Sequence, residues 1–230
     1  MKVDWMPVTR FEQNCSVLWC ETTGQAAVVD PGGDIDLVLD FLDWEKLKLE
    51  LVLVTHGHFD HCGGAKEIAA RTGARIEGPH RNEEHLLRAL SEQGARYGAR
   101  AQSFTPDRWL EDGDSVRFGG VELVAIHCPG HTEGHLAYFH APDQWAFVGD
   151  ILFRGAIGAW EHPDGNLIKL VSSIRERLFT LGDCVRFVPG HGETSTFGRE
   201  RRENPFVGDA ALEQVRCGWA AKGQALDGHV

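Results

Sequence analysis

The sequence predicts an α/β fold in which two β-sheets are packed between outer layers of helices. Short β-type runs gather in two blocks, one in the first third of the chain and one in the middle, and each block ends in helical segments. The 230 residues are 42% hydrophobic and 25% charged, which is typical of a globular protein that buries its core without cross-links. The chain therefore fits one domain, or one domain with a small appendage.

The first block alternates strands and helices. Its strands are assigned from short apolar, β-branched runs bounded by turns, and its helices from apolar residues spaced three or four apart. Asp34 is expected to cap the first helix, because its side chain can accept a backbone hydrogen bond there. The expected elements are strands over 15–20 and 26–30, a helix after Asp34, a strand over 49–54, and helices over 64–71 and 82–93.

The second block is typical of an antiparallel meander followed by helices. Gly, Pro and Asp turns separate its short β-rich runs. A long amphipathic helix follows, with leucine, isoleucine and valine near one face. The expected elements are strands over 115–118, 121–127, 135–140 and 145–148, a helix over 166–181, a strand over 185–188 and a helix over 209–217.

Charge and composition narrow the class of partner. A net charge of −11 and a pI near 5.5 argue against nucleic acid, which needs a basic surface. No apolar run approaches the roughly 18 residues of a membrane span, and residues 1–15 carry no apolar signal-peptide core. The six cysteines show no C-x-x-C spacing and fit a reducing compartment. We therefore expect a cytoplasmic protein that acts on a small molecule, and its oligomeric state stays open.

The most informative stretch is Thr-His-Gly-His-Phe-Asp-His at residues 55–61. It places three imidazoles and a carboxylate directly after the apolar strand predicted over 49–54. Such a cluster at the end of a buried strand indicates a site with room for two metal ions.

Three further strand ends carry metal-type ligands. His131, Asp150 and His191 each follow an apolar run, next to glycine or proline turns. Each alone would more often be an ordinary loop residue, but together with residues 56–61 they make five imidazoles and two carboxylates, which suits two divalent ions. His127 and His135 flank the His131 turn, where either could brace it, and a structural role is expected for them and not ligation. No role is assigned to the remaining histidines, His80, His85, His140, His162 and His229.

These motifs resemble those of the metallo-β-lactamase superfamily. Its His-x-His-x-Asp-His signature stands at residues 56–61, and His131, Asp150 and His191 follow in the family's order in Pro-Gly-His-Thr, Gly-Asp and Gly-His-Gly. The resemblance spans roughly residues 10–205. It implies the four-layer αββα sandwich of the metallo-β-lactamase fold, with a catalytic domain over 1–205 and a helical extension over 206–230.

The resemblance also implies roles for these residues. The first metal would be held by His56, His58 and His131, the second by Asp60, His61 and His191, and Asp150 would bridge the two. Asp60 and Asp150 would be the catalytic carboxylates. Asp30, in Val-Asp-Pro-Gly, resembles a residue that supports the metal loop. The expected cofactor is two divalent ions, with zinc first and iron or manganese compatible with the same ligands.

Within the superfamily the chain is most similar to short hydrolases of the glyoxalase II (hydroxyacylglutathione hydrolase) type. This implies hydrolysis of S-acyl-glutathione or a related small thioester by a metal-bound hydroxide. Phe153, Arg154 and Trp160 are expected to contact substrate. The chain departs from the family at two places. Ala-Trp-Glu follows Gly158, where the family has basic or polar residues. Only 39 residues follow His191, fewer than the longer helical C-terminal domain of full-length glyoxalase II would need.

Three alternatives remain open. A persulfide dioxygenase of this family would use one iron held by His56, His131 and Asp150, and oxygen uptake would reveal it. A lactone or β-lactam hydrolase would use the same fold. A binding module that kept the fold and lost activity would tolerate the change His58→Ala.

Overall fold

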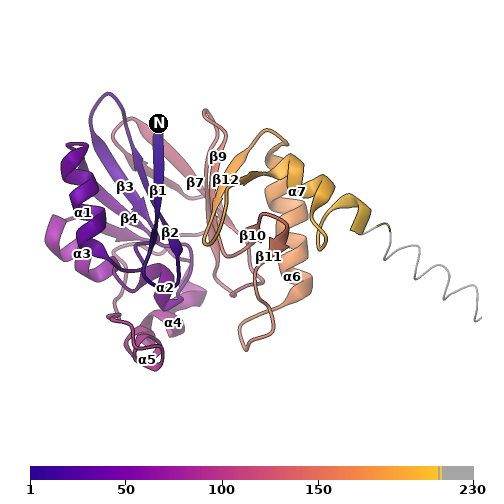
Figure 1. The fold of residues 1–230 in the computed structure, drawn as a ribbon, viewed down its shortest axis with the longest axis horizontal. Coiled ribbons are helices and arrows are strands. Elements are labelled where there is room, and N and C mark those ends of the chain that lie inside the picture. The colour runs from indigo at the N-terminus through magenta and orange to yellow at the C-terminus, as the bar shows by residue number, and fades with distance from the viewer. Residues whose placement is uncertain (212, 214–230) are drawn as a thin grey trace, which may run out of the picture.

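Two sheets stand face to face, with helices on their outer surfaces (Figure 1). The architecture comes from a computed structural model that describes residues 1–211 and 213. It confirms the αββα sandwich. No helix of the described residues is long and apolar enough to cross a membrane.

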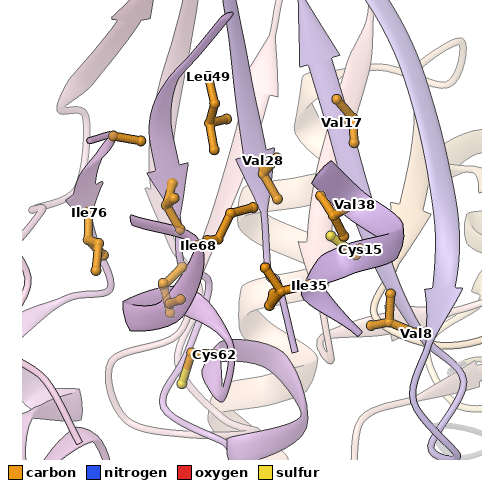
Figure 2. Close-up of a cluster of buried hydrophobic side chains, with 14 of the residues drawn as sticks. Val8, Cys15, Val17, Val28, Ile35, Val38, Leu49, Cys62, Ile68 and Ile76 are labelled. Atoms are coloured by element: carbon orange, nitrogen blue, oxygen red, sulfur yellow. The ribbon is translucent and has the colours of Figure 1, made fainter. Parts of the chain in front are cut away.

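The first sheet has five strands in sequence order. β1 to β3 pair antiparallel, and β3 to β5 pair parallel through helical crossovers. The strands are β1 (Lys2–Val8), β2 (Gln13–Trp19), β3 (Gln25–Val29), β4 (Lys48–Leu53) and β5 (Arg75–Glu77). The helices are α1 (Ile35–Trp44), the short α2 (Phe59–Cys62) and α3 (Ala65–Thr72). Figure 2 shows Ile35 and Val38 of α1 and Ile68 of α3 in the apolar layer that packs against this sheet.

The second sheet contains the predicted meander. Strands β6 to β9 pair antiparallel in order, and β12 then joins parallel to β9. The strands are β6 (Ser115–Phe118), β7 (Val121–His127), β8 (Leu136–His140), β9 (Trp145–Gly149), β12 (Arg186–Pro189) and β13 (Ser195–Thr196). A separate hairpin pairs β10 (Leu152–Phe153) with β11 (Ala156–Ile157), and α6 (Leu167–Ser172) and α7 (Phe197–Glu203) lie on the outer side.

The two sheets meet through a shared apolar layer. Leu51 and Leu53 of β4 belong to the same buried cluster as Leu123 of β7, Tyr138 of β8 and Phe147 of β9. These residues alternate with others that face the helices, as expected for strands buried on both faces. This layer holds β4, β7 and β9 side by side across the sandwich, so that the loops that follow these strands lie close to one another.

Two segments predicted as continuous helices are each divided into shorter helical elements. The segment over 82–93 is a 3₁₀ turn (Arg81–Glu83), α4 (Glu84–Arg88) and α5 (Leu90–Arg96), with a break at Ala89. At the break the Ala89 amide donates to the carbonyls of both His85 and Leu86, and the Leu86 carbonyl also accepts from the Gln93 side chain. The helix predicted over 166–181 passes from α6 into a π-helical turn (Ser173–Leu178) and a 3₁₀ turn (Phe179–Leu181).

Other expectations need smaller corrections. Asp34 precedes α1 in a left-handed conformation, and its carboxylate accepts from the Thr9 amide at 2.6 Å instead of capping the helix. β1 and β5 were not predicted, because β1 alternates polar and apolar residues at the sheet edge and β5 has only three residues. Of the helix predicted over 209–217, residues 209–211 and 213 are helical and the rest lies outside the described residues.

Candidate metal centre

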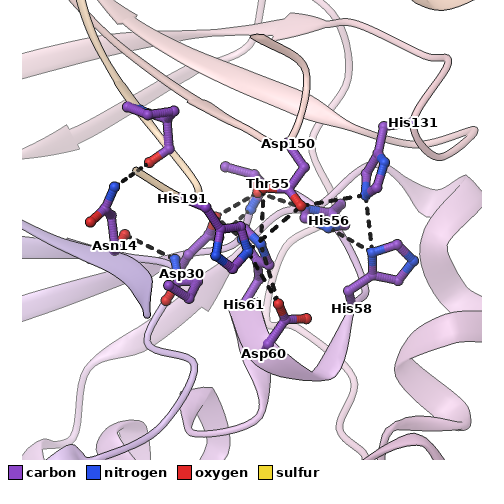
Figure 3. A network of polar contacts seen from close by, with 12 residues as sticks. Asn14, Asp30, Thr55, His56, His58, Asp60, His61, His131, Asp150 and His191 are labelled. Carbon is purple, nitrogen blue, oxygen red and sulfur yellow. Dashed lines mark hydrogen bonds and ion pairs between the residues drawn. The ribbon is translucent and has the colours of Figure 1, made fainter. Parts of the chain in front are cut away.

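The predicted ligands come from loops that leave four strands at one end of the two sheets. His56, His58, Asp60 and His61 follow β4 of the first sheet. His131, Asp150 and His191 follow β7, β9 and β12 of the second. Figure 3 shows all seven side chains turned towards a common centre. The sheets are the rigid support that brings these loops together.

The first cluster consists of His56, His58 and His131, one nitrogen of each lying within 4.8 Å of the others. The His58 Nδ1 atom is 3.0 Å from His56 Nε2 and 3.1 Å from His131 Nε2. Burial, together with the neighbouring histidines, lowers the pKa of His56 well below its usual value and that of His58 to about 3. Burial also lowers the pKa of His131. All three imidazoles are therefore neutral, which is the form that binds a metal.

The second cluster consists of Asp60, His61 and His191. The Asp60 Oδ2 atom is 3.3 Å from His191 Nε2 and 3.9 Å from His61 Nε2. Burial disfavours charge on both imidazoles, yet the surrounding carboxylates outweigh it and raise the pKa of each. The histidines of the second cluster therefore favour the protonated form, whereas those of the first cluster favour the neutral form.

Asp150 lies between the clusters. Its Oδ1 atom is 3.2 Å from His61 Nε2, and its Oδ2 atom is 3.8 Å from the Nε2 atoms of both His131 and His191. Burial would raise the pKa of the Asp150 carboxyl, but the histidines around it hold that pKa far below its usual range. The carboxylate is ionised and placed to serve both clusters.

The donor set fits two cations. Asp150 Oδ1 and His61 Nε2 are buried and face each other at 3.2 Å, and neither has a hydrogen bond to any other described residue. Buried polar atoms in folded proteins are usually fully satisfied, and bound metal ions would complete the coordination of these two atoms. Carboxylate and imidazole ligands without thiolate suit divalent first-row metals.

The outward-facing nitrogens of the ligand histidines are held in place. His61 Nδ1 lies 2.9 Å from Asp30 Oδ2, His131 Nδ1 lies 2.8 Å from the Ala159 carbonyl, and His191 Nδ1 lies 3.1 Å from the Phe11 carbonyl. In its neutral form each ring can donate there through Nδ1, which leaves Nε2 unprotonated towards the centre and free to bind a metal. Asp30 also accepts from the amide and the hydroxyl of Thr55, at 2.7 and 2.6 Å.

The comparisons with known proteins agree with this geometry. Residues 8–196 match the family model of the metallo-β-lactamase superfamily. The chain belongs to this superfamily. It is a metal-dependent hydrolase of the metallo-β-lactamase fold with a candidate dinuclear His/Asp site.

Three similar proteins illustrate the range of the superfamily. The hydroxyacylglutathione hydrolase GloC of Haemophilus influenzae is 38% identical over 90% of this chain and 98% of its own length. The BLEG-1 B3 metallo-β-lactamase superposes with a TM-score of 0.83 and 29% identity, over 90% of this chain and 99% of its own. TTHA1623, solved in a di-iron-bound form, gives a TM-score of 0.79 and 28% identity over 88% and 99%.

The superfamily motifs have partners that the sequence did not predict. Glu83 is buried and accepts hydrogen bonds from the amides of Gly57 and Gly134. The His135 side chain accepts from the amide of Asp150 and so supports that ligand, and the His135 carbonyl accepts from the Cys128 amide at 2.9 Å, across the base of the His131 turn. His127, 3.0 Å from the Glu133 carbonyl, does lie against that turn. The contacts of Glu83 and His135 could not be found from local sequence pattern, because each joins segments that lie far apart in the sequence.

His162, to which no role was assigned, lies against the first cluster. Its ring centroid is 5.7 Å from that of His58 and 5.2 Å from that of His131. The loop that carries it is tied to α4 by a 2.9 Å contact between Asp164 and His85. His162 therefore covers one side of the cluster.

Two of the three predicted substrate contacts, Phe153 and Arg154, lie beside the exposed part of the second cluster. Asp60 and His191 of the second cluster are 18% and 31% exposed and His58 of the first is also partly exposed, whereas His56 and His61 are fully buried. The ring of Phe153 lies 6.4 Å from that of His191, and Arg154 pairs with Glu193 in the His191 loop. Trp160 follows Ala159, whose carbonyl contacts His131, and its ring packs against Phe206. Their contact with substrate stays a prediction.

Proposed function

We propose that this superfamily member is a dinuclear thioesterase of the glyoxalase II type that cleaves S-acyl-glutathione or a related small thioester. The similarity to GloC over 98% of that relative carries the proposal. The seven converging ligands support it, because hydrolysis by a metal-bound hydroxide needs ions held at the site. We further propose that the partner is a small molecule and that the protein acts in the cytoplasm.

The two ions would be held by His56, His58 and His131 on one side and by Asp60, His61 and His191 on the other, with Asp150 shared. When bound, divalent ions lower the pKa of water towards about 7 and polarise a carbonyl. Zinc is the ion we expect first. Iron and manganese suit the same nitrogen and oxygen ligands, and the di-iron form of TTHA1623 supports iron as an alternative.

The carboxylates of this chain would handle the proton. Burial alone would raise the pKa of Asp60, but its hydrogen bond with His191 and the charge of His61 bring it below the usual value. Asp60 and Asp150 are thus ionised at neutral pH and can accept the proton of the attacking water. A thiolate leaves with little protonation, since a thiol titrates near about 8.5, so no strong general acid is required.

Two cavities beside the second cluster offer room for the two parts of a thioester. One, of about 390 Å³, is lined by Phe11, Phe59 and Asp60 among others. The other, of about 520 Å³, is lined by Trp5, Arg154 and the 192–194 segment of the His191 loop. We propose that the acyl and thiol portions lie on opposite sides of His191, in these cavities.

The test is a substrate panel with protein loaded separately with zinc, iron and manganese. We expect hydrolysis of S-D-lactoylglutathione or of simpler acyl thioesters, and background rates for folded His58→Ala protein. Failure on every thioester with a full metal complement would refute the proposal.

A second candidate is β-lactam hydrolysis, favoured by the superposition on BLEG-1 over 99% of that protein. A chromogenic cephalosporin and a lactone therefore belong in the same panel. Glutathione persulfide with an oxygen electrode tests the dioxygenase alternative. A kcat/KM for any of these above that for thioesters would replace the thioesterase assignment.

A further inference from the structure

The first cluster is assembled from two different sheets. His56 and His58 follow β4 of the first sheet, and His131 follows β7 of the second. The spacing of the three ligating nitrogens therefore depends on contacts that join the two loops across the sandwich. Two hydrogen bonds join the sheets just before the ligands of the first loop. The Thr55 carbonyl accepts from the Leu136 amide at 2.9 Å, and the Val54 carbonyl accepts from the Tyr138 hydroxyl at 2.7 Å.

Glu83 provides a further tie at the level of the ligands themselves. Its Oε2 atom accepts from the Gly57 amide at 2.8 Å, between His56 and His58. Its Oε1 atom accepts from the Gly134 amide at 2.6 Å, three residues after His131. The Glu83 side chain is fully buried, so both bonds are shielded from water. Hydrogen bonds from amides to a carboxylate are among the stronger ones in proteins.

The two glycines leave space for this carboxylate. A Cβ atom on Gly134 would lie 2.7 Å from Glu83 Cγ and 2.9 Å from its Oε1 atom. A Cβ atom on Gly57 would lie 2.6 Å from the Cβ atom of Leu86, in the helix that starts just after Glu83, and 3.2 Å from Glu83 Oε2. Both glycines have negative φ angles, so close approach, and not backbone conformation, explains why they are glycines.

We propose that Glu83 is a positioning residue of the metal centre: one carboxylate that joins the His56–His58 loop to the His131 loop and so sets the geometry of the first cluster. Glu83 forms no hydrogen bond or ion pair with the seven ligand side chains, and it acts through the two backbone amides. The inference rests on the two-metal arrangement of the proposed function and is independent of the substrate.

The test measures metal binding and not turnover. In a His191→Ala background the second cluster lacks one ligand, so cobalt(II) reports mainly on the first. Glu83→Gln keeps the size of the side chain but turns an NH₂ group towards one of the two amides. We expect about 10- to 100-fold weaker cobalt binding and a changed visible spectrum for His191→Ala/Glu83→Gln, the range typical of groups that orient metal ligands.

Glu84→Gln is the matched control, since Glu84 is the next residue, is 38% exposed and pairs with Arg88 on the surface. It should leave cobalt affinity and spectrum as in His191→Ala. Cobalt affinity and a visible spectrum in His191→Ala/Glu83→Gln equal to those of His191→Ala alone would overturn the proposal. A failed thioester assay would not, because the cobalt measurement does not depend on the substrate.

A second measurement needs no variant. In metal-free wild-type protein labelled with ¹⁵N-glycine, the Gly57 and Gly134 amides should exchange with solvent as slowly as amides of the central strands. Rapid exchange of either amide would show that Glu83 does not hold that loop, and would overturn the proposal even if Glu83→Gln does not fold.

Discussion

His135 accepts a hydrogen bond from the backbone amide of Asp150 at 3.1 Å. Its Nδ1 atom lies 3.0 Å from the Leu136 carbonyl, so the ring donates there and presents an unprotonated Nε2 to Asp150. The same ring stacks on His56, with centroids 4.5 Å apart and an angle of 18° between the planes. One imidazole outside the ligand set thus supports the shared carboxylate and a ligand of the first cluster.

Replacing His135 by phenylalanine should therefore impair the metal centre more than the fold. The stacked ring is retained, but the Asp150 amide loses its acceptor, which costs about 1–3 kcal/mol of unfolding free energy. We expect reduced metal content on both sites, measured by elemental analysis, and a loss of activity larger than the stability change explains.

His140→Phe is the control for that variant. His140 is also buried, but its polar partner is Asp143 at the far end of β8. It should lose stability without losing metal. Equal metal content in both variants would contradict a role for His135 at the site.

Asp30 should matter most for the second cluster. Asp30→Asn removes the charge that faces His61 and places an NH₂ group among the donors from Thr55 and His61. Removing one partner of a buried charged network costs roughly 3–5 kcal/mol. We expect a clear drop in the denaturation midpoint of the metal-free protein and loss of one ion per chain.

Asp34→Asn, in the same loop, provides the comparison, because Asp34 is exposed and its retained oxygen can still accept from the Thr9 amide. A metal-free Asp30→Asn protein as stable as Asp34→Asn would contradict the importance of the buried network.

Gly190 should tolerate no side chain. A Cβ atom there would lie 2.1 Å from Asp150 Oδ1 and 2.5 Å from His61 Cε1. Its φ angle is negative, so alanine adds no backbone strain and the effect is purely steric. Gly190→Ala should displace Asp150, cost about 1–3 kcal/mol by overpacking and abolish binding of the second ion in a calorimetric titration.

The matched substitution is Gly120→Ala, where the nearest neighbour is Cys20 Sγ at an ordinary 3.6 Å. That protein should bind both ions. Two ions of unchanged affinity in Gly190→Ala would show that Asp150 can move without loss.

The convergence of the ligand side chains was predictable because each stands in a short motif at a strand end, where local pattern and position coincide. Glu83 was not predictable, since it is 26 and 51 residues from its two partners and lies in a polar segment that is helical by propensity. His162 was passed over for the same reason. The meander was predictable from turns and alternation, whereas the break at Ala89 depends on a tertiary arrangement that periodicity does not contain.

Acidification should remove the two ions in order. A metal binds the neutral imidazole, so protons compete with it only as the pH approaches the pKa of the ligand. In the first cluster the pKa of His58 is lowered to about 3 and those of His56 and His131 are also lowered, so protons compete there only well below the ordinary value of 6.5. In the second cluster the pKa values of His61 and His191 are raised, so protons compete already above 6.5. Dialysis at decreasing pH, followed by elemental analysis, should give two ions per chain, then one, then none, and the ion retained longest should be the one that His58→Ala removes. Simultaneous loss of both ions, or earlier loss from the first cluster, would contradict this assignment of charge within the site.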